Sequence, residues 1–204
     1  MKVLIIALFL LVNGFRVCAQ EEMVLFDGES LDGWEIIDFG GQGGISVKDD
    51  AIVIEAGDPL SGIRWTGDFP KTNYEVNFQA KRVRGHDFFC GMTFPVKDSF
   101  LTLVLGGWQG WVNGLSSIDG YDAANNETYD SYGFSPDRWY RIRLRVTDEK
   151  IEAWADDNKI VDFTIGKHDL SLRWEMEPTV PFGISTYYTT GAVRFIRVNI
   201  IADE

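Results

Sequence analysis

Apolar and polar residues alternate one by one along most of this chain, the pattern of strands with one buried face. Over residues 74–81, Tyr, Val, Phe and Ala alternate with Glu, Asn, Gln and Lys. The same alternation predicts strands over 140–146 and 151–155. Helical periodicity is almost absent. We therefore predict antiparallel strands whose outer faces meet water or a ligand.

Short polar turns separate these strands and predict hairpins at 48–50, 147–150 and 156–159. The last two strands are predicted over 180–187 and 193–201, with a turn at Thr190 and Gly191. Ten or more short strands without helical spacers predict a sandwich or a barrel. Because residues 106–138 are long and irregular, we favour an all-β, two-sheet antiparallel jelly-roll sandwich. No linker or repeat appears, so one domain is predicted over 20–204.

Residues 1–19 are predicted to be a signal peptide. Lys2 precedes an apolar run over 3–12, and Ala19 closes a small-residue cleavage site. That run is shorter than the roughly 18 residues of a bilayer-spanning helix, and no later segment approaches that length. Cys18 suggests a lipoprotein anchor, but Arg16 before it fits a lipobox poorly. We expect cleavage after Ala19 and a secreted or periplasmic protein without membrane insertion.

The charge of the chain excludes some partners. The formal net charge is −12, and removal of the leader takes away only positive charges. Nucleic-acid binding requires a basic surface, so it is not expected. Cys90 is the one cysteine left after cleavage; it lies in an apolar stretch and is predicted to be buried, without a disulfide. Nothing in the chain indicates a protein partner.

The stretch 108–122 holds two tryptophans, three glycines and two aspartates. Glycines and aspartates this dense are unusual in a packed strand, so we predict an ordered loop over a binding surface. Aromatic faces beside acidic groups suit a carbohydrate, although the indoles alone can also cap a sheet edge. The candidate substrate-binding residues are Arg64, Trp65, Trp108, Trp111, Asp119, Asp122, Arg173, Glu175 and Tyr187.

His86 and Asp87 are the candidate catalytic residues. Histidine titrates near neutral pH, and this pair follows Gly85 at an expected turn. The alternative is a solvated turn histidine. His168 looks like an exposed loop residue.

An oxygen-rich stretch is compatible with a structural calcium ion, although its spacing matches no EF-hand loop. Its residues are Asp119, Asp122, Asn125, Asn126 and Glu127. No other cofactor is expected. With two histidines and one mature cysteine, a zinc site of ordinary composition is not expected.

Residues 24–34, with the phrase LFDGESLDGW, resemble the opening of the 3-keto-disaccharide hydrolase family. The segments 45–54, 73–78 and 182–198 look like further strands of that family, so the resemblance spans nearly the whole mature chain. The middle departs from it, because residues 86–95 replace the family's usual N-S-G-I phrase. The resemblance implies a concanavalin A-like jelly roll and hydrolysis of glycosides oxidised at ring carbon three, and it assigns no catalytic residue here.

Such chemistry needs a base, an acid for the leaving oxygen and groups that stabilise an enolate. The E-x-D-x-x-E signature of retaining glucanases is absent, so that activity is not expected. The main alternative is a non-catalytic carbohydrate-binding module that uses Trp65, Trp108, Trp111 and Tyr187. A third is a structural domain of the cell envelope.

Overall fold

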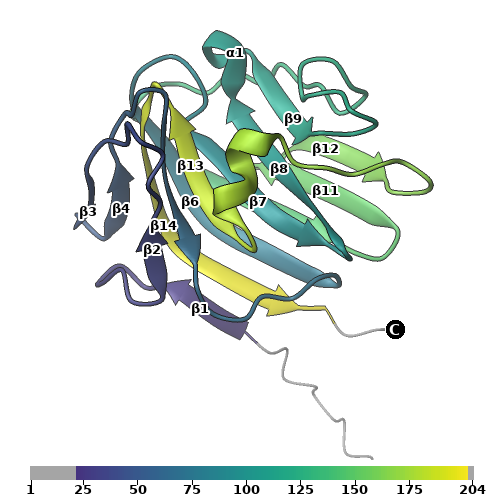
Figure 1. The fold of residues 1–204 in the computed structure, drawn as a ribbon, viewed down its shortest axis with the longest axis horizontal. Helices are drawn as coiled ribbons and strands as arrows, with labels where there is room; N and C mark the ends of the chain where they lie inside the picture. Colours follow the sequence, from purple (N-terminus) through teal and green to yellow (C-terminus); the bar gives the residue numbers. More distant parts are fainter. Residues whose placement is uncertain (1–21, 202–204) are drawn as a thin grey trace, which may run out of the picture.

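The computed structural model describes residues 22–201, so the predicted signal peptide lies outside the described residues. Strands form two antiparallel sheets packed face to face (Figure 1). The chain is therefore the two-sheet, all-β jelly-roll sandwich that the alternating pattern predicts.

The larger sheet has the order β12-β11-β10-β6-β14-β4-β3, and β1 also pairs with β14. Its strands are β1 (Glu22–Phe26), β3 (Ile45–Lys48), β4 (Ala51–Ile54), β6 (Tyr74–Arg84), β10 (Tyr140–Val146), β11 (Lys150–Ala155), β12 (Asn158–Thr164) and β14 (Thr190–Ile200). The smaller sheet has the order β2-β5-β13-β7-β8-β9. Its strands are β2 (Trp34–Ile36), β5 (Leu60–Trp65), β7 (Cys90–Val96), β8 (Ser99–Gly106), β9 (Val112–Ser116) and β13 (Gly183–Tyr187).

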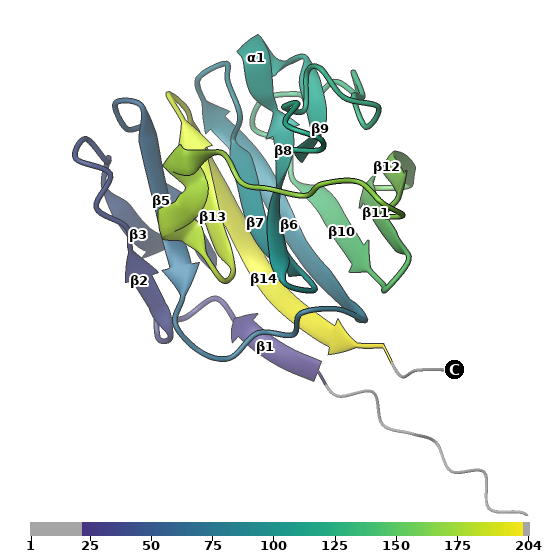
Figure 2. The same cartoon turned by 45° about the vertical axis from the view of Figure 1, so that its right-hand side comes forward.

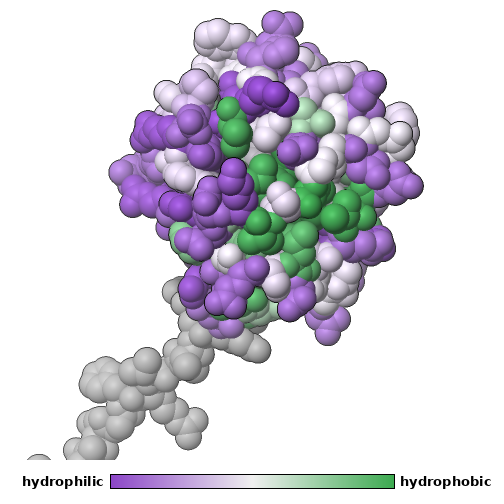
Figure 3. Space-filling view, turned by 90° about the vertical axis from the view of Figure 1, so that its left-hand side faces the viewer, coloured by the Kyte–Doolittle hydropathy of each residue, from purple (hydrophilic) through white to green (hydrophobic). Residues whose placement is uncertain are grey.

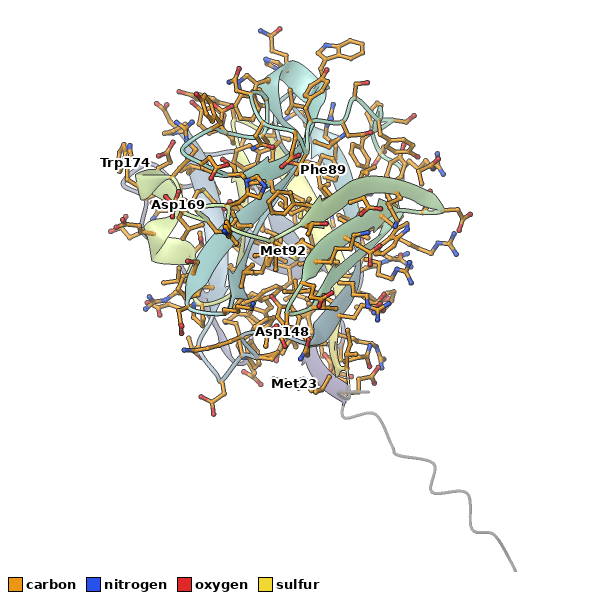
Figure 4. All side chains as sticks on the ribbon, turned by 90° about the vertical axis from the view of Figure 1, so that its right-hand side faces the viewer. Met23, Phe89, Met92, Asp148, Asp169 and Trp174 are labelled. Carbon is orange, nitrogen blue, oxygen red and sulfur yellow. The ribbon has the colours of Figure 1, made fainter. Side chains whose placement is uncertain are left out.

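The core lies between the two sheets and follows from the two-residue periodicity of each strand. On β10, Tyr140, Ile142 and Leu144 are buried, while the arginines between them are exposed. Met92 of β7 and Phe89, directly before that strand, lie inside the sandwich (Figure 4) and are almost fully buried. Cys90 is also buried, as expected; it forms no disulfide within the described residues, and burial raises the pKa of its thiol.

The sequence prediction of a loop over 108–122 is wrong for residues 112–116. They form β9, a buried strand that pairs with β8. Gly114 is required there because its φ is 147° and a Cβ atom would lie 2.8 Å from the carbonyl oxygen of Thr128. Asn113 is accommodated because its side chain accepts from Gly106 N and donates to Asp130 and Tyr132. The polar composition thus serves a strand covered on both faces.

The predicted turn at Thr190 and Gly191 is also misplaced. Both residues belong to β14, and the turn falls at Tyr188 and Thr189. Strand β14 then carries a bulge between Arg194 and Arg197, where its pairing with β6 shifts. The bulge places Phe195 in a left-handed conformation, with a φ of 55°.

A segment that we call the strap, residues 165–180, crosses the outer face of the smaller sheet (Figure 2). It ends in the 3-10 helix η1 (Trp174–Thr179), which contacts β5 and β13. The approach is close: a Cβ atom on Gly183 would lie 2.5 Å from the carbonyl oxygen of Thr179. The strap therefore forms a third, partial layer over one sheet.

The side of the molecule with β2, β3 and β4 shows an apolar area (Figure 3). On β2, Ile36 is exposed, and on β3, Ile45 and Val47 are partly buried against the core. No helix within residues 22–201 has the length and apolar character to cross a membrane.

Candidate functional site

A cavity of about 360 Å³ opens on the outer face of the smaller sheet, beside the strap. Its floor comes from the strands and its walls from the strap and from the loops next to β7 and β9. The lining residues are Leu60, Asp87, Phe88, Thr102, Val104, Trp108, Ser116, Asp122, Arg173, Glu175, Met176 and Tyr187. A few polar groups thus converge on an apolar floor, as in many small-molecule sites.

Buried hydroxyl groups fix the strap to this floor. Thr179 Oγ1 donates to Thr93 Oγ1 at 2.6 Å, and Thr93 Oγ1 lies 3.1 Å from Thr102 Oγ1 on the next strand. Polar groups buried in this way are satisfied by each other. They hold η1, and the wall that it carries, at a fixed height above the sheet.

One arginine links two acidic groups in the cavity wall. Arg173 Nε donates to Glu175 Oε1 at 2.7 Å, and Arg173 Nη1 lies 3.6 Å from Asp122 Oδ2. The second carboxylate oxygen, Glu175 Oε2, is buried and has no hydrogen-bond partner among the described residues. A buried acceptor without a donor is unfavourable, so this atom is where a ligand hydroxyl or a transferred proton is best accommodated.

Asp87 organises the rim of the cavity. Its Oδ1 accepts from the N–H groups of Phe88 (2.8 Å) and Trp108 (3.2 Å), and its Oδ2 accepts from Gln109 N (3.2 Å). Trp108 and Gln109 both have positive φ angles, within the short turn that ends β8. Both oxygens of Asp87 are thus occupied by the backbone that positions the Trp108 indole.

Arg82 lies below this turn and is buried. A Cβ atom on Gly106 would lie 2.5 Å from its Nη2 atom, so only glycine fits over the guanidinium. Nε and Nη2 have no hydrogen-bond partner among the described residues. Burial lowers the pKa of Arg82, and the charge of Asp87 opposes that shift.

His168 and Asp119 join two segments that carry cavity residues. His168 Nδ1 lies 2.6 Å from Asp119 Oδ2, and Asp169 N donates to Asp119 Oδ1 at 2.8 Å. The hydrogen bond with Asp119 raises the pKa of His168 and lowers that of Asp119. Glu127 lies 3.4 Å from the other ring nitrogen. This pairing was missed from the sequence, in which His168 is an unremarkable loop residue far from Asp119.

The cavity brings together six of the eleven candidate residues. They are Asp87, Trp108, Asp122, Arg173, Glu175 and Tyr187. Sequence reasoning missed Phe88, Met176 and the floor residues, because their side-chain direction depends on strand register and on the path of the strap.

The other five candidates lie outside the cavity lining. Arg64 forms an ion pair with Glu35 at 2.7 Å, across β5 and β2. Trp65 packs edge to face on Trp34, with ring centroids 5.5 Å apart. Trp111 is 68% exposed, and His86 is exposed on the turn next to Asp87. The fifth, Asp119, lies outside the cavity lining and pairs with His168.

The oxygen-rich loop is held by its own hydrogen bonds. The Asn126 amide donates to the carbonyl oxygens of Leu115, Tyr121 and Asp122. Within residues 22–201, no group of three or more His, Cys, Asp and Glu side chains is arranged to bind a metal ion. A structural calcium ion here remains a prediction.

The chain matches the family described as the 3-keto-alpha-glucoside-1,2-lyase-like domain over residues 21–199. It belongs to that family, which confirms the resemblance in its first and last strands. No curated protein sequence matches the chain.

Solved structures share its fold. A putative glycosyl hydrolase from Parabacteroides distasonis has a TM-score of 0.56 at 15% identity, over 89% of this chain and 94% of that one. The carbohydrate-binding module CBM66 from Bacillus subtilis has a TM-score of 0.54 at 10% identity, over 81% and 94%. The Crh5 transglycosylase in complex with NAG has a TM-score of 0.59 at 11% identity, over 90% and 84%. The same sandwich therefore serves both enzymes and binding modules, and function must be argued from the site.

Proposed function

We propose that the chain acts on glycosides oxidised at ring carbon three and breaks the bond between carbon one and the glycosidic oxygen. The observation that carries the proposal is the Glu175 carboxylate in the cavity, with one oxygen held by Arg173 and the other buried without a partner among residues 22–201. Membership of the 3-keto-alpha-glucoside-1,2-lyase-like family supports the substrate class. Export of the protein, after cleavage following Ala19, belongs to the same proposal.

The chemistry requires few groups because the substrate is already activated. A ketone at carbon three acidifies the proton on carbon two, which Glu175 removes. The electron pair forms the double bond between carbons one and two as the bond from carbon one to the glycosidic oxygen breaks. That oxygen leaves with a proton, and addition of water to the double bond then completes the hydrolysis.

Each remaining group has a role that follows from its place. The Arg173 guanidinium offers donors to the oxygen at carbon three as negative charge develops there. Its Nε also holds Glu175 Oε1 at 2.7 Å, which fixes the position of the carboxylate in the cavity wall. Asp122, when protonated, can supply the proton to the leaving oxygen. Trp108 and Tyr187 offer ring faces to the sugar. In this assignment Asp87 positions Trp108, and His86 stays outside the reaction.

The second candidate function is non-catalytic carbohydrate binding. The observation that favours it is the position of Asp87: both of its oxygens accept backbone hydrogen bonds at the rim, so the carboxylate holds the backbone that carries Trp108. A binding module needs only the aromatic rim and the hydroxyl contacts of Arg173, Glu175 and Asp122.

The test compares the purified protein on 3-keto-trehalose and on trehalose, by NMR detection of the released sugar and of deuterium uptake at carbon two in D₂O. We expect turnover of the keto sugar alone. Glu175→Gln removes the base and should lower turnover by about 100-fold or more. Glu177→Gln is the matched control, because Glu177 is exposed on the same short helix.

Two results distinguish the candidates. Sugar binding that quenches tryptophan fluorescence, without deuterium uptake or sugar release, supports the binding module. Equal loss of turnover in Glu175→Gln and Glu177→Gln contradicts the role of Glu175.

A further inference from the structure

The outer face of the larger sheet carries a second hollow, on the opposite side of the sandwich from the cavity. Two depressions of about 650 and 550 Å³ share four lining residues, so they form one continuous groove. The shared residues are Gln79, Arg141, Asp156 and Asp157. The groove crosses the strands β10 and β6 and reaches β14.

Strand register places four arginines around two amides; three of the four line the groove, and Arg194 lies beside it. Gln79 of β6 pairs with Arg141 of β10 on one side and Arg194 of β14 on the other. Two residues along, Asn77 lies between Arg143 and Arg197. The result is two parallel rows, Arg-Gln-Arg and Arg-Asn-Arg, on the solvent face. Such a concentration of guanidinium groups stands out in a protein with a net charge of −12.

Two of the four guanidinium groups, one in each row, lie over aromatic rings. Arg143 Cζ lies 3.8 Å from the ring centroid of Trp154, and Arg194 Cζ lies 4.2 Å from that of Trp139. A guanidinium held flat on a ring keeps its N–H donors in the plane, where they can reach carboxylate or sulfate oxygens in pairs.

Neutralisation by acidic partners is uneven among the four arginines. Arg141 pairs with Asp157 at 3.2 Å, and Arg197 pairs with Glu22 at 2.7 Å. The nearest carboxylate oxygen to Arg143 is 3.9 Å away, on Glu75. Arg194 donates to Gln79 at 2.9 Å and forms no ion pair within residues 22–201. The charge available to a ligand is therefore greatest at the two stacked arginines.

Phe195 adds an apolar surface to the same groove. It is 38% exposed, lines the smaller depression and sits in the β14 bulge at a φ of 55°. A left-handed conformation is unfavourable for a bulky aromatic residue. Bulges often redirect a side chain at a functional surface, and here the bulge places a phenyl ring beside the arginine rows.

From these contacts we infer that the groove is a second carbohydrate site, specific for oligosaccharides that carry anionic groups. The guanidiniums of Arg143 and Arg194 bind carboxylate or sulfate oxygens, the amides of Asn77 and Gln79 bind hydroxyls, and the ring of Phe195 lies against a sugar face. A flat groove with donors on both sides of an amide row fits an extended chain better than a single sugar. The inference does not depend on the chemistry proposed for the cavity.

The experiment titrates the full mature chain with three tetrasaccharides: tetragalacturonate, sulfated cellotetraose and unmodified cellotetraose. Calorimetry should detect binding of the two acidic sugars, weakened by added salt because the contacts are charged and exposed. The two acidic sugars separate a carboxylate requirement from a sulfate requirement. Binding of cellotetraose with equal affinity, or failure of both acidic sugars to bind, overturns the inference.

Variants locate the binding. Arg143→Gln should weaken it about tenfold, the loss expected for one charge-assisted contact. Arg145→Gln is the matched control, because Arg145 lies on the same strand and face but outside the groove lining. An equal loss in both variants indicates only diffuse charge and overturns the site.

Phe195→Gly separates binding from folding. Glycine relieves the left-handed backbone, so thermal stability should stay the same or rise while affinity falls about tenfold. Glu175→Gln should leave this binding unchanged, since Glu175 lies in the other cavity. Loss of acidic-sugar binding in Glu175→Gln contradicts the inference and places the ligand in the cavity instead.

Discussion

The carboxylate of Asp87 holds the backbone of Trp108, whose N–H donates to Oδ1 at 3.2 Å. The two residues are distant in sequence, yet this contact decides where the indole stands relative to the cavity. The sequence marked Asp87 as a reactive group, and its surroundings favour a positioning role. The difference matters for mutagenesis: loss of a positioning residue changes the stability and the place of Trp108, whereas loss of a base would lower turnover.

Asp87→Asn should destabilise the fold by about 1–3 kcal/mol, because the backbone N–H groups of Trp108 and Gln109 lose a charged acceptor. Denaturant unfolding, followed by tryptophan fluorescence, measures the change. Asp98→Asn is the control, since Asp98 is almost fully exposed and its ion pair with Lys71 is 3.4 Å long. A stable Asp87→Asn protein with ordinary fluorescence contradicts the positioning role.

Trp108→Ala should weaken sugar binding in the cavity by about 1–3 kcal/mol, with little loss of stability, because the indole lines the cavity and is 40% exposed. Trp111→Ala provides the comparison, as Trp111 is more exposed and lies outside the lining. Titration of both variants with the same keto sugar gives the answer. Equal losses in the two variants contradict the assignment of Trp108 to the cavity.

The pair of His168 and Asp119 should make stability depend on pH in a defined window. The pKa of His168 is raised on folding, so its contribution is present at low pH and is lost as the pH rises through the folded-state pKa. The pKa of Asp119 is lowered, so its contribution is lost as the pH falls through its own folded-state value.

The pair therefore stabilises the protein most between these two pKa values. Unfolding free energy should fall above the upper limit of the window and below the lower one. In His168→Gln, the decrease of the unfolding free energy above the upper pKa should be smaller. Unfolding curves at a series of pH values measure this change. An identical pH profile in His168→Gln and the wild-type protein argues against the pair.

Gly183→Ala should displace the strap. The new methyl group would meet the carbonyl oxygen of Thr179 at 2.5 Å, and we expect a loss of about 1–3 kcal/mol in stability. Sugar binding in the cavity should fall as well, since η1 carries Glu175. Gly133→Ala is the control, because a Cβ atom there has no neighbour within 4 Å among the described residues. Unchanged stability in Gly183→Ala contradicts the close approach.

The sandwich was predictable because strands with one buried face place an apolar residue at every second position. On β10, Tyr140 and Ile142 face inward and Arg141 faces out, as the alternation indicates. Strand β9 was not predictable from that rule, since it is covered on both faces and its polar residues bond to neighbouring loops. Alternation in the sequence identifies a strand with one buried face, but it gives no signal for a strand that is buried on both faces.

The candidate site was only partly predictable. The sequence analysis found Arg173, Trp174 and Glu175 as a local trio, and the contact between Arg173 and Glu175 is indeed local. Their meeting with Asp122 depends on the strap returning over the smaller sheet, which no short-range pattern encodes. Arg82 was missed because its burial beneath Gly106 arises only when β6 and the turn after β8 come together.

The strap and the strands beneath it contribute different things to this protein. The strands supply the cavity floor and most of the buried apolar core, whereas η1 and the neighbouring loops supply the charged groups that line the cavity. Substitutions in the strap can therefore alter which sugar is accepted while the sandwich beneath stays intact. Descendants of this chain should diverge first in the strap and last in the paired strands, and a library confined to residues 165–180 is the place to begin changing its specificity.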